Sequence, residues 1–240
     1  MSIFAIADLH LSFAPDTDKP MDVFGPRWHD HPERIKESWC SNVTEEDTVI
    51  VAGDISWGMK LADAAYDLDW VDDLPGHKVM LKGNHDLWWS GINRLNSMYE
   101  SITFLQNDAY CVQQDERDIW ICGSRGWITP DDDDYTEADE KIYKREILRL
   151  RASLQFAADA AKASGKDGEM IGFLHFPPVA KAGRYSGFMQ AFEDFGVNEV
   201  YYGHIHGEDG FRSAVQGEYY GTEYRLISAD YLNCGLLKIR

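Results

Sequence analysis

Side chains that commonly bind metal ions occur in five short segments of this chain, and four of these segments directly follow an apolar run typical of a buried β-strand. Five of the eight histidines fall within them. In open α/β folds, the carboxyl ends of the strands meet at one edge of a sheet, so side chains from several strands can converge there. The pattern therefore predicts a metal site at a sheet edge. The segments are Asp8-Leu9-His10, Gly53-Asp54, Gly83-Asn84-His85-Asp86, Phe173-Leu174-His175-Phe176 and Gly203-His204-Ile205-His206.

Buried-strand runs alternate with helical patterns in the first hundred residues, which is typical of parallel βαβ units. Between the first strand and the first helix, prolines and a glycine at residues 12–26 predict a loop without regular structure. Short runs separated by polar turns then favour a more antiparallel sheet. Strands are predicted at residues 3–7, 48–52, 78–81, 102–105, 109–112 and 119–122, and helices at 29–43, 61–71 and 87–98.

The second half of the chain continues with one long helix and then alternates again. Helices are predicted at residues 135–163 and 187–195, and strands at 170–174, 199–202, 224–228 and 234–239, the last two being hairpin-like. No internal repeat, linker or low-complexity segment interrupts the pattern. Residues 1–240 are therefore expected to form a single α/β domain.

The charge balance restricts the possible partners. With 41 acidic residues against 23 lysines and arginines, the formal net charge is -18. Such a chain repels a polyphosphate backbone, so long nucleic acids are not expected as partners, whereas divalent cations are attracted. Neither a signal peptide nor a membrane-spanning stretch is apparent, and the four cysteines form no C-x-x-C pair. We expect a cytoplasmic protein with reduced thiols, and its oligomeric state remains open.

The types and spacing of the candidate ligands indicate two ions. Asp8 and His10 are two residues apart, as are His204 and His206, and such pairs point to the same side of an extended backbone. Oxygen and nitrogen donors without thiolates suit Mn, Fe, Zn or Ni. Seven candidates exceed the need of one tetrahedral ion and fit two ions about 3.5–4 Å apart that share a carboxylate. Asp54 is the predicted bridge. The seven are Asp8, His10, Asp54, Asn84, His175, His204 and His206.

Two further residues have predicted catalytic roles. A dinuclear centre of this kind activates water for in-line displacement at phosphorus, and the leaving oxygen then needs a proton or a counter-charge. His85 is adjacent to a ligand but is not needed as one, which suits a general acid or a contact to a phosphoryl oxygen. Asp86 is expected to hold the His85 imidazole in one tautomer, although it could also cap the following helix.

Several other polar residues have competing interpretations. His175 alone would be read as a satisfied core histidine, and the four aspartates at residues 131–134 as a solvated loop before a helix. Arg184, Arg125 and Trp127 follow or flank ligand loops and are weak candidates for substrate contacts. Each is equally consistent with a surface or packing role.

The order D-x-H, GD, GNHD, H and GHxH resembles that of the calcineurin-like metallophosphoesterases, and all five blocks are present without substitution. The wider sequence is similar to small bacterial predicted phosphohydrolases of this superfamily. The resemblance implies a four-layer α/β/β/α sandwich of two mixed β-sheets flanked by helices. It also implies that Asp8, His10, Asp54 and His206 hold one divalent ion, that Asp54, Asn84, His175 and His204 hold the other, and that His85 lies over the phosphate.

The resulting functional prediction is a phosphoesterase that hydrolyses a small phosphate ester by means of metal-bound hydroxide. A phosphodiester or nucleotide-like substrate is slightly favoured over a monoester, because His85 could protonate a poor leaving alkoxide. A nuclease acting on short oligonucleotides and a catalytically silent metal-binding scaffold of the same fold are the alternatives.

Overall fold

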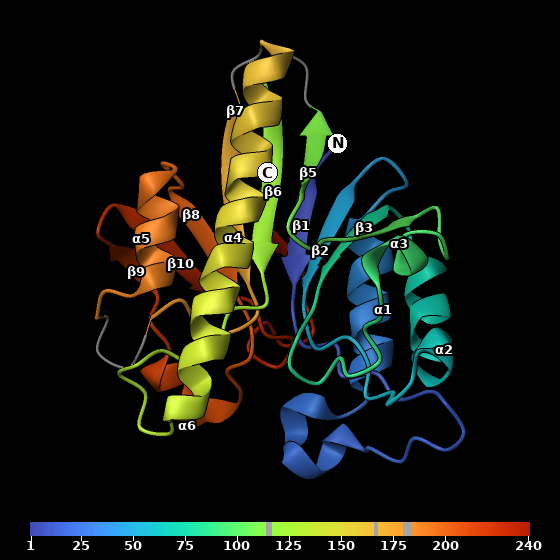
Figure 1. The fold of residues 1–240 in the computed structure, drawn as a ribbon. Coiled ribbons are helices and arrows are strands. Elements are labelled where there is room, and N and C mark those ends of the chain that lie inside the picture. The colour runs from blue at the N-terminus through green and yellow to red at the C-terminus, as the bar shows by residue number, and fades with distance from the viewer. Residues whose placement is uncertain (114–116, 166–167, 180–183) are drawn as a thin grey trace.

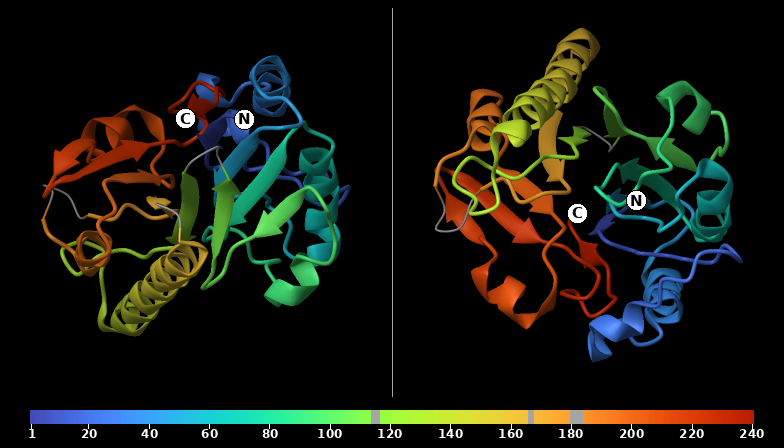
Figure 2. Two further views of the ribbon diagram at one scale, coloured as in Figure 1. Left: turned by 90° about the horizontal axis from the view of Figure 1, so that it is seen from above. Right: turned by 60° about the horizontal axis from the view of Figure 1, so that its bottom comes forward.

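Two β-sheets lie face to face in the computed structural model, which describes residues 1–113, 117–165, 168–179 and 184–240. Helices cover the outer face of each sheet (Figures 1 and 2). The first sheet has the strand order β11-β1-β2-β3-β4, and the second β5-β6-β7-β8-β10-β9. Both sheets contain parallel and antiparallel pairs. The predicted four-layer sandwich of two mixed sheets is confirmed.

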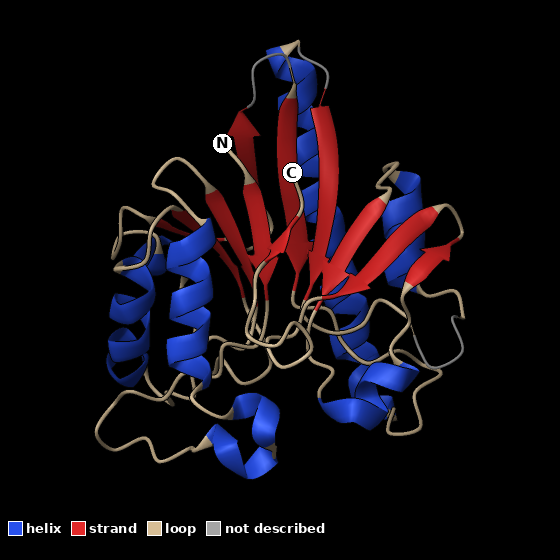
Figure 3. Cartoon of the chain, turned by 180° about the vertical axis from the view of Figure 1, so that it is seen from behind, coloured by secondary structure: helices blue, strands red, loops and turns tan. Residues whose placement is uncertain are grey.

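The first sheet is built by the first hundred residues and closed by the last strand. Strands β1 to β4 run parallel, and β11 pairs antiparallel with β1. Helices α1 and α2 cover its outer face (Figure 3). The elements are β1 (Ile3–Ile6), α1 (His31–Asn42), β2 (Thr48–Ala52), α2 (Leu61–Asp72), β3 (His77–Leu81), α3 (Ile92–Leu95), β4 (Ile102–Phe104) and β11 (Leu237–Lys238).

The second sheet carries the long helix α4 on its outer face, together with α5 (Figure 1). Strands β6, β7, β8 and β10 run parallel, while β5 and β9 are antiparallel edge strands. The elements are β5 (Ala109–Gln113), β6 (Asp118–Ser124), α4 (Glu137–Ser164), β7 (Gly168–Leu174), α5 (Gly187–Asp194), β8 (Glu199–Tyr202), α6 (Gly207–Ser213), β9 (Gly217–Tyr219) and β10 (Thr222–Leu226).

The apolar core forms three layers because the central strands are buried on both faces. In β1, Phe4 and Ile6 face the helices, whereas Ile3 and Ala5 face the second sheet. This two-residue alternation is the ordinary geometry of a strand. It explains why the strands read as continuous apolar runs.

Three predicted features are wrong in detail. The helix expected at residues 87–98 is reduced to α3, because Trp88 turns into the core and Gly91 precedes the helix. Strand β4 pairs parallel with β3 rather than joining an antiparallel sheet. The two C-terminal strands do not form a hairpin with each other: β10 pairs with β8 and β9, and β11 with β1.

Two stretches contain helices that the sequence analysis did not predict. Helix α6 begins after the last ligand segment. Residues 12–26, expected to be irregular, contain the short 3-10 helix η1 (Met21–Phe24), which is followed by a second one, η2 (Pro26–Trp28). No helix among the residues described combines the length and hydropathy that crossing a bilayer requires.

Candidate metal centre

All seven predicted ligands come together where loops following β1, β2, β3, β7 and β8 meet between the two sheets, at the lower edge in Figure 3. Asp8, His10 and His206 form one group of donors, and Asp54, His175 and His204 form another; within each group the donor atoms lie within 4.8 Å of one another. Asn84 adjoins the second group, because its Oδ1 lies 2.8 Å from His175 Nε2. Each group contains three of the four residues that the family resemblance assigns to one ion.

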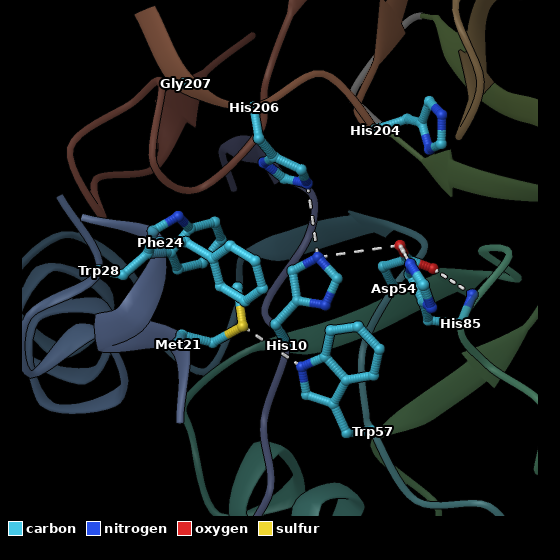
Figure 4. Close-up of a pocket in the computed structure, with 10 residues that line it drawn as sticks. All are labelled: His10, Met21, Phe24, Trp28, Asp54, Trp57, His85, His204, His206 and Gly207. Carbon is cyan, nitrogen blue, oxygen red and sulfur yellow. Dashed lines mark hydrogen bonds and ion pairs between the residues drawn. The ribbon is translucent and has the colours of Figure 1, made fainter. Parts of the chain in front are cut away.

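Asp54 lies between the two groups. Its Oδ2 is 3.8 Å from His10 Nε2 and 3.3 Å from His175 Nε2. In the first group, His10 Nε2 and His206 Nε2 face each other at 3.4 Å (Figure 4). Donors that share an ion at about 2.1 Å lie about 3.0–3.4 Å apart. The spacing and the donor chemistry of these side chains therefore fit two divalent ions that share the Asp54 carboxylate.

Four of the predicted ligands occupy backbone conformations that residues other than glycine rarely adopt. Asp8, His10, Asp54 and His204 have φ angles of 62°, 46°, 51° and 70°. Such conformations cost about 1–3 kcal/mol each and persist where the surroundings impose them. The first two loops impose them on each other, since Asp8 N–H donates to Gly53 O at 2.9 Å and His10 N–H to Asp54 O at 3.0 Å. The strained turns aim the ligands of β1 and β2 at one point.

Asp86 has a different role from the one predicted. Its buried carboxylate accepts hydrogen bonds from the backbone N–H groups of four residues in two loops and from the indole N–H of Trp88, at 2.7–3.2 Å. Both oxygens are thereby engaged, and none of these bonds involves the His85 imidazole. The predicted orienting contact to His85 is corrected: Asp86 instead ties the Gly83–Asp86 turn to the loop carrying Asp54. The four backbone donors are Asp54, Ile55, Ser56 and Gly83.

Gly83 leaves no room for a side chain beside the central carboxylate. A Cβ at this position would lie 2.1 Å from Asp54 Oδ1 and 2.2 Å from Asp54 N. We expect Gly83→Ala to lower the free energy of unfolding by about 1–3 kcal/mol and to weaken binding of both ions, because Asp54 must move. Denaturant unfolding and metal titration measure the two effects. Gly91→Ala is the matched control, since no atom lies within 4 Å of its added Cβ; equal stability of the two variants would contradict the close packing.

The electrostatics of the second group favour a positive charge at its centre. Burial lowers the pKa of His175, but Asp54 and then Asp8 raise it by more, to about 9. The pKa of Asp54 is held well below its usual range: burial opposes this, and His175 and His10 outweigh it. Burial and the neighbouring His175 lower the pKa of His204 to about 3. In the metal-free protein, the proton on His175 therefore supplies the positive charge that a bound metal ion would supply.

This competition predicts how metal binding depends on pH. His175 is protonated in the metal-free protein below its pKa of about 9, and its Nε2 must lose that proton to become a ligand. Affinity for the second ion should therefore rise by up to about tenfold per pH unit from pH 7, and level off above about pH 9. Calorimetry in buffers of different ionisation enthalpy measures the released proton. Affinity that stays constant between pH 7 and 9 would show that His175 is neutral before the ion arrives.

Asp230 supports the first group and was not predicted. Its Oδ1 lies 2.9 Å from His206 Nδ1, and its Oδ2 accepts from Gly207 N–H at 3.1 Å. A carboxylate on the second nitrogen of a ligating histidine fixes the ring and raises its basicity. Spacing along the chain could not reveal this contact, because the two side chains meet only after β9 and β10 have folded back.

His85 lies at the mouth of the centre, with 43% of its side chain exposed. Its Nε2 is 4.0 Å from Asp54 Oδ2, and its backbone N–H donates to Asp54 Oδ1 at 2.8 Å. Burial lowers its pKa, although Asp54 acts in the opposite direction. The Trp57 ring lies 4.3 Å from the His85 ring, centroid to centroid. This position leaves the imidazole free to contact a bound substrate.

The three weak candidates for substrate contacts have other partners. Arg184 forms an exposed ion pair with Asp131 at 2.8 Å. Arg125 pairs with the buried Glu146 at 3.4 Å and stacks over Trp127, whose indole N–H donates to Asp139. These side chains do not line the cavity at the metal centre. A role in substrate binding remains a prediction for each.

Comparisons with known proteins agree with this geometry. The family model of the calcineurin-like phosphoesterases matches residues 1–208. The chain is 35% identical over 85 residues to the Gene 66 protein of Mycobacterium phage D29, and 39% identical over 57 residues to that of Mycobacterium phage L5. These matches cover 35% and 24% of this chain, and only 40% and 27% of the phage proteins.

Two crystal structures share the fold over nearly the whole chain. They are a protein of unknown function, AQ665 from Aquifex aeolicus, and TT1561 from Thermus thermophilus; each has a TM-score of 0.54. Sequence identities are 14% and 12%, with 99% of this chain covered and 95% and 97% of theirs. The similarity to these two structures shows the fold, and the match to the family model shows the family. This chain therefore belongs to the calcineurin-like phosphoesterase family.

Proposed function

We propose that this enzyme hydrolyses a small phosphodiester or nucleotide-like ester in preference to a phosphomonoester. The observation that carries the proposal is a pair of recesses that meet at His85 and Trp57. One, of about 330 Å³, is lined by four of the predicted metal ligands and by an apolar wall. The other, of about 350 Å³, is bordered by residues 16–19, Met59 and Leu87. A monoester needs room for one substituent, whereas a diester needs room for two.

The residues have the following proposed roles. Asp8, His10, Asp54 and His206 would hold one ion, and Asp54, Asn84, His175 and His204 the other. Two such ions supply a hydroxide nucleophile near neutral pH and neutralise charge on the phosphoryl oxygens. His85 donates a proton to the leaving oxygen or a hydrogen bond to the phosphoryl group. The donor types favour Mn, Fe, Zn or Ni and do not select among them.

Further parts of the proposal concern context. We place the activity in one domain spanning residues 1–240 and in the cytoplasm, where the four cysteines, which form no disulfide in the described part of the chain, would stay reduced. The net charge of -18 disfavours long nucleic acids. Short oligonucleotides remain the second candidate substrate, and a scaffold without turnover is disfavoured because no ligand position is replaced.

Matched chromogenic substrates test the proposal. Protein with defined metal content is assayed with bis-p-nitrophenyl phosphate and with p-nitrophenyl phosphate, and kcat/KM is compared. We expect the diester to be the better substrate. A preference for the monoester would overturn the proposed substrate class, and two bound ions without turnover of either ester would favour the scaffold. Asp54→Asn protein prepared in the same way excludes contaminating phosphatases.

A further inference from the structure

The larger wall of the first recess is made by side chains that have no part in binding metal. We call the part of the cavity that this wall encloses the aromatic recess. It is defined by Met21, Phe24, Trp28 and Trp57. Three of these come from η1 and η2, which lie against the metal centre in Figure 4. Asp54 and His85 line the same cavity of about 330 Å³. A substituent bound in this recess would therefore lie directly beside a phosphate at the metal centre.

The segment that forms the recess is tied down on several sides. Arg27 donates to Glu208 Oε1 at 2.9 and 2.7 Å and to Asp230 O at 3.2 Å. The Trp57 indole N–H points at Met21 Sδ at 3.4 Å, and a ring nitrogen of His31 lies 3.2 Å from Trp28 O. These contacts join the segment to α6, α1 and the β2 loop. The wall is therefore formed before a ligand arrives, which lowers the entropic cost of binding.

The rings of the recess touch the metal ligands themselves. Trp57 stacks on His10 at 4.8 Å between centroids and an interplanar angle of 21°, and Trp28 meets His206 edge-on at 5.4 Å. Phe24 stands at the mouth with 68% of its surface exposed, next to the similarly exposed Val23. A planar group bound in the cavity could stack on the exposed face of Phe24 and remove that apolar surface from water.

The chemistry of the lining selects the kind of group. Apart from the metal ligands and His85, the side chains around this cavity carry no charge and few polar atoms. Arg27, in the same segment, is already bonded to Glu208. Lys19, whose Nζ lies 5.8 Å from the Trp57 ring centroid, lines the second recess instead. A sugar or a second phosphate would lose its hydrogen bonds to water here without replacement, whereas a planar ring would lose little and gain stacking.

We propose that the aromatic recess is a specificity site for a planar aromatic substituent of the phosphate ester, seated between Phe24 and Met21 with Trp28 at its base. This inference rests on the proposed function, because it assumes that the phosphate itself binds at the metal centre. It narrows the substrate class to phosphate esters that carry an aryl or heteroaryl group.

Non-hydrolysable ligands test the recess without requiring turnover. Calorimetry compares the affinities of phenylphosphonate, cyclohexylphosphonate and methylphosphonate for metal-loaded protein. We expect phenylphosphonate to bind roughly tenfold more tightly than methylphosphonate, within the range that ring stacking gives. The cyclohexyl ligand, which is as bulky but not flat, should bind more weakly than phenyl. Equal affinity for phenyl and cyclohexyl would overturn the assignment of a planar ring.

Substitutions then locate the effect. Phe24→Ala should lower the phenyl-to-methyl affinity ratio roughly fivefold, because one face of the ring loses its partner. Val23→Ala is the matched control: its side chain is 74% exposed, lies beside Phe24 and does not line the cavity, so the ratio should not change. A ratio that survives Phe24→Ala, or that falls equally in both variants, would overturn the location.

The outcomes distinguish this inference from the proposed function. A phenyl preference that depends on Phe24, in a protein without esterase activity, would uphold the recess and reject the hydrolytic proposal. Diester hydrolysis together with equal affinity for the three phosphonates would do the reverse.

Discussion

Asp54→Asn is expected to lower turnover by about 10³-fold or more and to weaken binding of both metal ions. The side chain reaches His10 and His175 from one carboxylate oxygen, so its charge serves both groups of donors. Because the pKa of Asp54 is lowered by the neighbouring histidines, the carboxylate is ionised throughout the working pH range. Asparagine keeps the shape but removes the charge, and several kcal/mol of transition-state stabilisation go with the ions.

The substitution isolates charge from folding. Asp54 Oδ1 accepts from the His85 N–H at 2.8 Å, and an asparagine oxygen can accept the same bond. Metal content by elemental analysis, kcat and denaturant unfolding are measured together. Asp47→Asn is the control, because that carboxylate is also buried and accepts from Thr44 N–H just before β2, at the end of the strand away from the metal centre. Wild-type turnover in Asp54→Asn protein would refute the shared bridge, as would loss of only one ion.

The convergence of the predicted ligands could be expected from the sequence because its determinants are local. Each follows a short apolar strand, and the carboxyl ends of parallel strands come together wherever the sheet forms. Asp8, Asp54 and Asn84 are placed by β1, β2 and β3, which are neighbours in one sheet. His175 and the His204–His206 pair follow adjacent strands of the second sheet. The apolar runs in the sequence and the strand order of the two sheets therefore point to the same meeting place for these side chains.

What could not be predicted depends on contacts between distant segments. Asp86 looks like a partner of its neighbour His85, yet three of its donors come from a loop about thirty residues away. Asp230 lies in a segment, residues 228–232, that resembles the small bacterial phosphohydrolases, but its role is set by contact with His206 in the folded chain. The wall formed by Met21, Phe24 and Trp28 lies in a stretch whose prolines indicated only a loop. Side-chain roles set by tertiary contacts leave no periodic signal in the sequence.

His85→Asn is expected to keep both ions and to lower turnover by about 10²–10⁴-fold, the range for loss of a general acid. The imidazole stands at the mouth of the centre, while the contact of this residue to Asp54 Oδ1 is made by its backbone N–H, which the substitution preserves. The loss should be larger for alkyl esters than for p-nitrophenyl esters, because p-nitrophenolate leaves without a proton. A role confined to holding the loop would lower both rates equally.

The pH profile and the metal content complete the test. Burial lowers the pKa of His85 below its ordinary value, so the protonated imidazole is lost at a lower pH than in a free histidine. The kcat/KM of the wild type should therefore fall as the pH rises through this lowered pKa. The variant should lack that fall. His77→Asn is the control, since His77 opens β3 at the end away from the metal centre and bonds to Thr103. If His85→Asn protein loses an ion, His85 is a ligand and the acid must be sought among the other side chains of the two recesses.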